Sequence, residues 1–280
     1  MIMLDRKDQS VEVAVVYLAW GRARRMINPY HRFFESYCTY LAGIDHRLYI
    51  IFKGFDSAAA CVNTRKIFDS VEYTPIFTGD EGLDIGAYFE AAPQISCEYL
   101  CFLNTYSRVN GDDWLKKLYV NLRLPDVGLV GATGSFEMSP HPSVENNGYP
   151  NVHVRSNGFM MRRRDFLSAR RGRALVTKED TYLLETGSGS FTSYILQRAQ
   201  DILVVGKNGR GYSPPFWPVS DTFRQGNQSN LLILDNRTDD FALADAGTKQ
   251  SLFKRTWQSG HVRPDLAERG NLLGVRDLSR

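Results

Sequence analysis

A short polar segment that directly follows an apolar run is the part of this chain best suited to hold a ligand. Tyr99–Leu103 is uninterrupted apolar sequence, and Asn104, Thr105, Tyr106 and Ser107 follow it at once. Such a run is typical of a strand buried on both faces. Because ligands in open α/β sheets lie beyond the carboxyl ends of the strands, we expect these polar residues to face a cleft.

Strand-like and helix-like patterns alternate on both sides of this segment. This alternation predicts an α/β fold with a mostly parallel central sheet and helices on both faces. Pro75 indicates an edge or irregular position for the third strand. We expect a main domain over residues 1–219 and an appended C-terminal segment over 220–280 that packs on the same domain. The expected strands are 11–19, 47–52, 71–77, 98–103, 127–130 and 201–205, and the expected helices are 29–41, 57–68, 84–92, 114–122 and 178–199, the last interrupted near Gly187–Gly189.

Composition sets the outer limits of function. The chain has 280 residues, of which 43% are apolar and 23% charged, which fits one α/β domain with a full core. The net charge of +3 balances 34 basic against 31 acidic residues and does not indicate a nucleic-acid partner. Four cysteines without CxxC spacing predict free thiols. The sequence contains no signal-peptide or membrane-spanning pattern, so we expect a cytoplasmic protein.

Residues 11–215 resemble the GT-A glycosyltransferases, in particular the large inverting family 2 of nucleotide-sugar transferases. Asp113-Trp114-Leu115 and Val127–Gly131 match that family's Asp-Trp-Leu helix and its Val-Gly-x-Val-Gly strand. The resemblance implies a GT-A-like fold and transfer of a sugar from a nucleotide-sugar donor to a glycan or lipid-linked glycan acceptor, in bacterial surface polysaccharide assembly. It also leaves a peripheral association with the inner face of the membrane open.

The chain departs from that family at its metal site. The family's Asp-x-Asp motif corresponds to Asn104, Thr105 and Tyr106, and these residues supply no carboxylate for a hard cation. We therefore predict transfer without a cofactor; a divalent metal is possible but not expected. Lys207, Arg210 and Arg224 would then hold the donor diphosphate through charge-assisted hydrogen bonds, unless their glycine-containing segment is an ordinary surface turn.

The pair Glu179-Asp180 provides the candidate catalytic base. The resemblance implies that such a pair opens the helix below the acceptor, with Asp180 favoured over Glu179 to accept the proton of the attacking hydroxyl. The alternative is structural, because Thr177 followed three residues later by Asp180 also predicts a capping box.

Further donor-binding candidates follow the first three strands. An aromatic ring at Tyr17 or Trp20 has the right type to stack on a nucleobase, but ordinary core burial explains these residues equally well. The resemblance places the turn after the second strand, with Lys53 and Asp56, at the nucleobase of the donor. It places Asp84, at the start of the helix over 84–92, at the nucleoside. The structural alternatives are a solvated turn for the first two residues and a helix cap for Asp84. These candidates, with the polar turn, are Tyr17, Ala19, Trp20, Lys53, Asp56, Asp84, Asn104, Thr105 and Tyr106.

A second function class stays open at this stage. The missing metal ligands also fit a non-catalytic GT-A-like protein that binds a nucleotide sugar or a partner enzyme. Hydrolysis of a donor by the purified protein separates this class from the enzyme.

Overall fold

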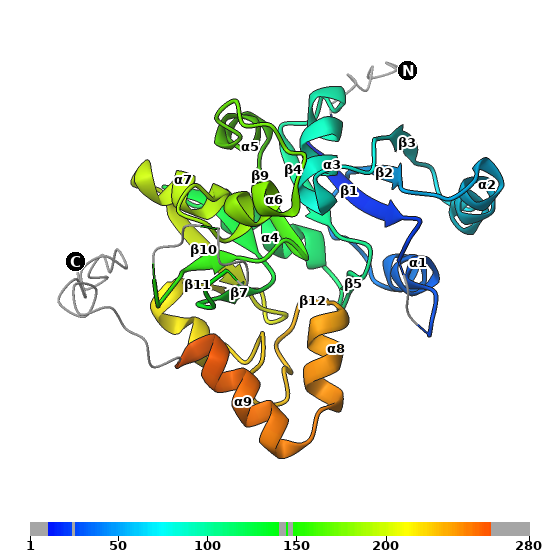
Figure 1. Cartoon of the computed structure of the whole chain (residues 1–280). Coiled ribbons are helices and arrows are strands. Elements are labelled where there is room, and N and C mark those ends of the chain that lie inside the picture. The colour runs from blue at the N-terminus through cyan, green and yellow to red at the C-terminus, as the bar shows by residue number, and fades with distance from the viewer. Residues whose placement is uncertain (1–10, 24–25, 140–143, 145–147, 259–280) are drawn as a thin grey trace, which may run out of the picture.

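A computed structural model describes residues 11–23, 26–139, 144 and 148–258. Its centre is an eight-stranded sheet surrounded by helices, so the expected α/β class is confirmed (Figure 1). In spatial order the strands are β11 (Gly211–Tyr212), β10 (Asp201–Val205), β6 (Val127–Gly131), β9 (Gly158–Arg162), β4 (Tyr99–Leu103), β1 (Val13–Trp20), β2 (Arg47–Lys53) and β3 (Thr74–Phe77).

Most strands of this sheet run in one direction. β3, β2, β1 and β4 are parallel neighbours, and β6 and β10 run the same way, whereas β9 lies antiparallel between β4 and β6. β3 forms one edge, as Pro75 predicts. Because β9 is antiparallel, it begins at the edge where β4 ends, with Leu103 paired to Gly158. The segment before β9 therefore lies beside the polar turn that follows β4.

Two apolar clusters cover the two faces of the sheet. Successive residues of β1 point to opposite faces, so Val16 belongs to the cluster that includes residues of α3, α5, α6 and α7, while Val15 belongs to the cluster that includes residues of α1 and α4. Burial on both faces explains the continuous apolar sequence of the central strands. The helices are α1 (Pro29–Thr39), α2 (Ala58–Arg65), α3 (Leu83–Ala91), α4 (Trp114–Leu122), α5 (Arg163–Ala169), α6 (Lys178–Glu185), α7 (Phe191–Gln197), α8 (Asn236–Leu243) and α9 (Ala246–Trp257).

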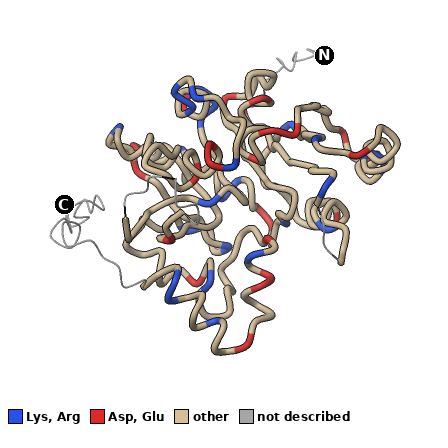
Figure 2. Tube along the Cα trace, viewed as in Figure 1, with Lys and Arg blue, Asp and Glu red and all other residues tan. Residues whose placement is uncertain are grey.

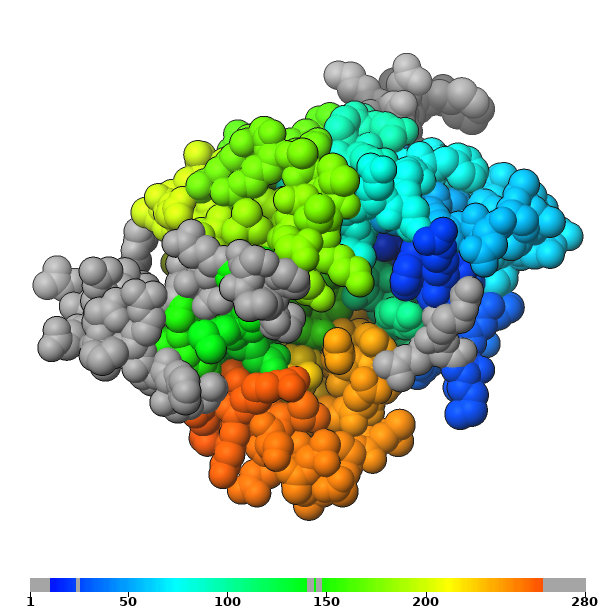
Figure 3. Space-filling model, viewed as in Figure 1, coloured from blue at the N-terminus to red at the C-terminus, as the bar shows by residue number. Residues whose placement is uncertain are grey.

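The C-terminal segment is attached to the main sheet domain at several points. β12 (Ile233–Leu234) pairs antiparallel with β5 (Arg108–Val109), and Asp239 of α8 accepts hydrogen bonds from Arg108 and Arg32. The apolar sequence at 231–235 thus gives a two-residue strand. A second small sheet pairs β7 (Gly134–Ser135) with β8 (His153–Val154). α8 and α9, orange in Figure 3, close one side of the molecule and contribute to the site described next.

Charged residues are spread over the molecule. Lys and Arg positions and Asp and Glu positions are both distributed over the described part of the trace (Figure 2), in keeping with the nearly balanced composition. Among the described residues, no helix is long and apolar enough to cross a membrane.

Candidate active site

A cavity of about 620 Å³ opens at the edge of the sheet where β4 ends and β9 begins. One wall comes from α6 and Ser156, and the other comes from α8, α9, the segments before them, Arg155 and Glu137. Both walls carry ionisable side chains, which makes this cavity the candidate active site. It is lined by Asn104, Glu137, Met138, Ser139, His153, Arg155, Ser156, Tyr182, Glu185, Thr186, Phe223, Arg224, Asp235, Asn236, Arg237 and Arg255.

Two carboxylates meet on the first wall through one serine. Ser156 donates its hydroxyl to Oδ2 of Asp84 at 2.8 Å and its backbone N–H to Oε1 of Glu185 at 2.9 Å. Asp84 stands in the first turn of α3 and Glu185 is the last residue of α6. The serine therefore holds an acid from each of two helices beside the cavity, and Glu185 lines it directly.

The surroundings of this pair favour a proton on one of its carboxylates. Burial, and after it repulsion from Glu185, raise the pKa of Asp84 to about 6, although hydrogen bonds from Ser156 and the Ile85 backbone oppose the shift. Two neighbouring carboxylates in a desolvated site do not both ionise easily. Such a pair can exchange a proton with a bound ligand near neutral pH.

Helix α6 directs Glu185 into the cavity. Tyr182 and Glu185 are three residues apart, so they share one face of the helix, and both line the cavity. The opposite end of α6 begins with a capping box in which Thr177 Oγ1 accepts the Asp180 N–H. Thr181 donates to the Gly82 carbonyl and fixes α6 against the loop before α3.

The second wall is rich in guanidinium groups. Oε1 of Glu137 accepts from Arg224 at 2.8 Å and from Arg255 at 2.5 Å. Arg155 donates to Asp235 Oδ2 at 2.9 Å. Arg224 is buried, and its Nε has no hydrogen-bond partner within the described part of the chain. We call the residues Glu137, Arg155, Arg224, Asp235, Arg237 and Arg255 the arginine wall.

The charged groups of the arginine wall shift one another's pKa values. Burial lowers the pKa of Arg224 to about 10; Glu137 opposes that shift, while Arg155 and Arg255 add to it by repulsion. Burial alone would raise the pKa of Glu137, but Arg224 and Arg255 outweigh it and lower the pKa. The wall therefore keeps an ionised carboxylate surrounded by several cations.

His153 is a buried cavity residue that stays neutral. Its Nδ1 lies 2.8 Å from the Asn151 carbonyl, which requires a hydrogen on Nδ1. Burial lowers the pKa of His153 to about 4, against a partial opposing effect of that hydrogen bond. A neutral imidazole is therefore the form present at neutral pH.

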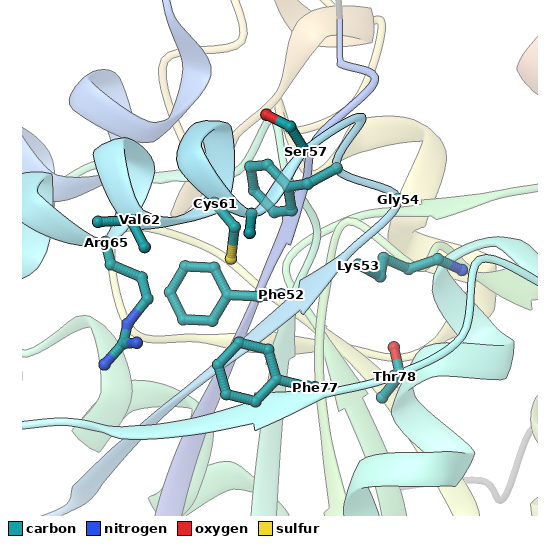
Figure 4. A pocket seen from close by; sticks show the side chains of 11 residues that line it. Phe52, Lys53, Gly54, Ser57, Cys61, Val62, Arg65, Phe77 and Thr78 are labelled. Carbon is teal, nitrogen blue, oxygen red and sulfur yellow. The ribbon is translucent and has the colours of Figure 1, made fainter.

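A second, apolar cavity of about 380 Å³ lies at the ends of β2 and β3. The rings of Phe52 and Phe77 lie side by side in it, and the Lys53 amine points away from them (Figure 4). That amine donates to the carbonyls of Glu81 and Leu83, directly before Asp84. Lys53 thus connects the apolar cavity to the acid pair along one edge of the sheet.

The predicted polar turn lies where the sequence places it. Asn104 lines the candidate active site and Tyr106 lines a small neighbouring cavity beside α8. Thr105 and Ser107 are buried. Asn104 Oδ1 accepts from the Tyr106 N–H and the Ser107 hydroxyl, so the turn is partly held by its own side chain. The expectation that this turn reaches a cleft is confirmed for Asn104 and Tyr106.

The structure assigns the candidates on β1 mainly to the core. Tyr17 is fully buried, stacks on Phe33 with ring centroids 3.7 Å apart and donates to the Thr105 carbonyl. Ala19 is fully buried too. Trp20 is partly exposed and donates to Asp80 at 3.0 Å. Of these three side chains, only Trp20 keeps a surface for a ligand, because close burial leaves a base no room to stack on Tyr17.

The candidates after β2 and at α3 lie in different environments. Lys53 is buried with its amine on two carbonyls, and burial lowers its pKa. Asp56 is largely exposed beside Arg22. Asp84 belongs to the acid pair and not to the second cavity. Contact of any of these residues with a nucleotide stays a prediction.

The candidate base Asp180 lies outside the cavity. Its Oδ2 accepts from the backbone N–H groups of Val176 and Thr177 and from the Thr177 hydroxyl. These hydrogen bonds lower its pKa. The structural alternative, a capping box, is therefore present, and Glu179 also does not line the cavity. A catalytic role for either residue stays a prediction without support from this geometry.

The three cations proposed as a diphosphate clamp are not brought together. Lys207 lines a separate cavity beside Asn208 and Tyr212, whereas Arg224 lines the candidate active site. Arg210 is exposed in the turn before β11. Arg224 is also paired with Glu137, so only this member of the predicted set lies where the acid pair is.

Sequence reasoning missed several residues of the cavity. Arg155 and Ser156 form part of a polar interruption between the two apolar stretches that become β8 and β9, and this interruption was the available signal. Glu185 stands just before Gly187, where α6 ends. Glu137 and Arg255 carried no signal, because their meeting depends on segments that are 118 residues apart.

No group of three or more His, Cys, Asp or Glu side chains among the described residues is arranged to hold a metal ion. The two acids nearest the cavity, Asp84 and Glu185, share Ser156 instead.

Comparisons with known proteins give distant structural likenesses only. No protein-family model and no curated protein sequence matches the chain. The 4-diphosphocytidyl-2C-methyl-D-erythritol synthase of Anaerococcus prevotii is similar at 9% identity and a TM-score of 0.46, over 69% of this chain and 85% of that one. A CMP:2-keto-3-deoxy-manno-octonic acid synthetase complexed with CTP is similar at 10% identity and 0.44, over 68% and 88%.

A third similar structure is the mannosyltransferase PcManGT from Pyrobaculum calidifontis in complex with GDP-Man and Mn²⁺. It shares 11% identity at a TM-score of 0.45, over 68% of this chain and 53% of that chain. These values are too low to assign an activity, so the function has to be argued from the site itself.

Proposed function

We propose that this protein transfers a sugar from a nucleotide-sugar donor to a glycan acceptor, with inversion, in assembly of a bacterial surface polysaccharide. The observation that carries the proposal is the cavity at the carboxyl edge of the sheet, which combines an acid pair with the arginine wall. A glycosyl transfer can use both features, because the acid pair can accept a proton and the arginine wall can hold a negatively charged group of a bound substrate.

Glu185 is the proposed base. It lines the cavity, and its carboxylate can take the proton of the acceptor hydroxyl as that oxygen bonds to the anomeric carbon and the bond from this carbon to the diphosphate oxygen breaks. Asp84 acts as a positioning residue, because the shared Ser156 fixes the two acids relative to each other. The hydrogen bond from the Ser156 N–H holds the Glu185 carboxylate beside the start of β9.

The second cavity is suited to the donor base. Phe52, Phe55 and Phe77 offer flat apolar surface at the ends of β2 and β3, and aromatic rings stack favourably on one another. A base there and a sugar near Asp84 would place the donor along the edge that Lys53 connects.

Transfer in this proposal does not require a divalent metal. Asn104, Thr105 and Tyr106 replace the carboxylates that would hold one, and in general cationic side chains can stabilise developing negative charge on phosphate oxygens in place of a metal. Activity that is lost in a chelator and restored by Mg²⁺ or Mn²⁺ would contradict this part of the proposal.

The direct test is a donor screen on the purified protein. Thermal shift and calorimetry across nucleoside diphosphates should identify one that binds, and the matching nucleotide sugar should then be hydrolysed slowly without acceptor. A ligand at 100 times its Kd stabilises the fold by about 2.7 kcal/mol, which a melting curve resolves. Donor binding without hydrolysis or transfer to any acceptor would favour the non-catalytic alternative.

A further inference from the structure

The arginine wall carries more positive groups than its own acids can neutralise. Four guanidinium groups, those of Arg155, Arg224, Arg237 and Arg255, line the cavity together with the carboxylates of Glu137 and Asp235. Within the described residues, Arg237 has no ion pair. The wall thus has two cations in excess of its acids.

Two of these cations contact the same aromatic ring. The guanidinium carbons of Arg155 and Arg224 lie 4.0 Å and 4.7 Å from the centroid of Phe223. Cation–π attraction offsets part of the repulsion between them. An anion bound in the cavity that both residues line would remove more of it, because charge-assisted hydrogen bonds to guanidinium are strong and often bidentate.

The most buried member of the wall has an unused donor. Arg224 is only 5% exposed, its terminal nitrogen donates to Glu137 and Thr256, and its Nε has no partner among the described residues. A buried donor without a partner costs about 1–3 kcal/mol, so the hydrogen-bonding capacity of this guanidinium is not fully used within the described residues.

Glu137 occupies the position that an external anion would take. Its carboxylate is held by Arg224 and Arg255 from two different segments, as a bound carboxylate or phosphate would be. Oε2 of Glu137 lies at the edge of hydrogen-bonding distance from the Ser135 hydroxyl, at 3.4 Å, so the side chain is fixed mainly by the two arginines.

We propose that the arginine wall binds a compact oxyanion, a carboxylate or a phosphate, carried by the acceptor. Binding of the oxyanion follows from the wall alone, and its assignment to the acceptor rests on the proposed function. Arg155 belongs to the arginine wall, and the adjacent Ser156 donates to the acid pair. An acceptor anchored by its anion therefore lies in the same cavity as Glu185.

The test uses three probes of different chemistry: glucuronate, methyl phosphate and glucose. Calorimetry on the full chain should show both anions binding and glucose not binding, with weaker anion binding at high salt. Preference for glucuronate indicates a carboxylate on the acceptor, and preference for methyl phosphate indicates a phosphate. Absence of binding by either anion overturns the proposal.

Two variants separate the wall from general surface charge. Arg255 is 60% exposed at its side chain, so Arg255→Gln should fold normally and weaken anion binding about 10-fold, the lower end for one charge-assisted hydrogen bond. Arg164→Gln, with a side chain 80% exposed on α5, is the matched control and should leave binding unchanged. Equal effects of the two variants overturn the proposal.

Glu137→Gln sharpens the same test. This variant keeps the shape of the side chain but removes the resident anion, so anion binding should strengthen by about 10-fold. Weaker binding would mean that Glu137 organises the wall instead of occupying its anion position. That result overturns the proposal.

The remaining outcomes separate this inference from the proposed function. Arg255→Gln could weaken binding of a nucleoside diphosphate far more than binding of its nucleoside, while the acceptor-like anions do not bind. In that case the wall holds the donor, and the acceptor assignment is overturned. If the anions bind as expected but no nucleotide sugar is hydrolysed or transferred, the oxyanion site is supported while the proposed function and the acceptor assignment fail.

Discussion

Polar side chains at two parts of the same sheet edge lie in different surroundings. At the ends of β1 and β2, Tyr17 and Lys53 direct their polar atoms to backbone carbonyls and are buried. At the start of β9, Arg155 and Ser156 instead bring charged partners to a cavity. Position at the carboxyl edge therefore does not by itself make a residue functional.

The difference follows from what covers each part. β1 lies between β2 and β4, and Phe33 of α1 stacks on Tyr17, so that end is filled by aromatic packing. β9 begins beside loops and the C-terminal helices, which leave a cavity of about 620 Å³. Charged groups are retained where they face this space, because water or a ligand can solvate them.

The largest effect is expected from Glu185→Gln. If Glu185 is the base, turnover should fall by about 10²–10⁴-fold while donor affinity changes little, since a carboxamide cannot accept the proton. Single-turnover assays with the identified donor and acceptor measure both quantities. Glu98→Gln, at an exposed glutamate before β4, is the matched control.

At the other part of the edge, substitution of Tyr17 should change the free energy of unfolding. Tyr17→Ala removes a fully buried ring and should lower the free energy of unfolding by about 3–5 kcal/mol. Tyr17→Phe keeps the ring and should cost about 1 kcal/mol for the lost hydrogen bond, without weakening nucleotide binding. Urea denaturation and calorimetry decide this, and a selective loss of nucleotide affinity in Tyr17→Phe would return Tyr17 to the donor site.

His153 should make the protein sensitive to acid. Its pKa is lowered to about 4 by burial, against about 6.5 in the unfolded chain, so the unfolded state binds more protons between these values. The stability that neutral His153 contributes should be present above pH 6.5 and lost as the pH falls through 4, by about 3 kcal/mol in total. Urea denaturation of wild type and His153→Gln at pH 7 and pH 4.5 should show the steeper loss in wild type.

Asp84 should change the free energy of unfolding with pH in the opposite direction from His153 and by a smaller amount. Its pKa is raised to about 6, so its contribution is most favourable below the unfolded value of about 3.9 and is lost as the pH rises through 6. Asp84→Asn should therefore gain about 2 kcal/mol relative to wild type between pH 4 and pH 7. If the difference in free energy of unfolding between the two proteins stays constant over this range, Asp84 does not lie in a desolvated acid pair.

The smallest effect is expected at the helix start that resembles a catalytic motif. Asp180→Ala removes the capping carboxylate at the first turn of α6 and should cost about 0.3–1 kcal/mol of stability. Turnover should change less than about 2-fold, since the residue lies outside the cavity. A loss of about 10²-fold in turnover with a normal unfolding curve would instead identify Asp180 as the base.

The order and type of the main elements were predictable from local pattern. Continuous apolar runs gave the central strands, Pro75 marked the edge strand, and Gly187–Gly189 marked the break between α6 and α7. Apolar periodicity is a property of neighbouring residues, so it survives in the sequence. The polar turn that begins at Asn104 was predictable for the same reason, because it directly follows a buried strand.

The composition of the site was decided by the tertiary structure. Asp84 and Ser156 are 72 residues apart, and Glu137 meets Arg224 across 87 residues, so neither contact leaves a local pattern. The sequence also could not show which of two compatible roles a residue takes: Thr177 and Asp180 form a cap, while Glu185 on the same helix reaches the cavity. That choice depends on which side of α6 faces β9 and which faces solvent, and only the three-dimensional arrangement of the helices determines it.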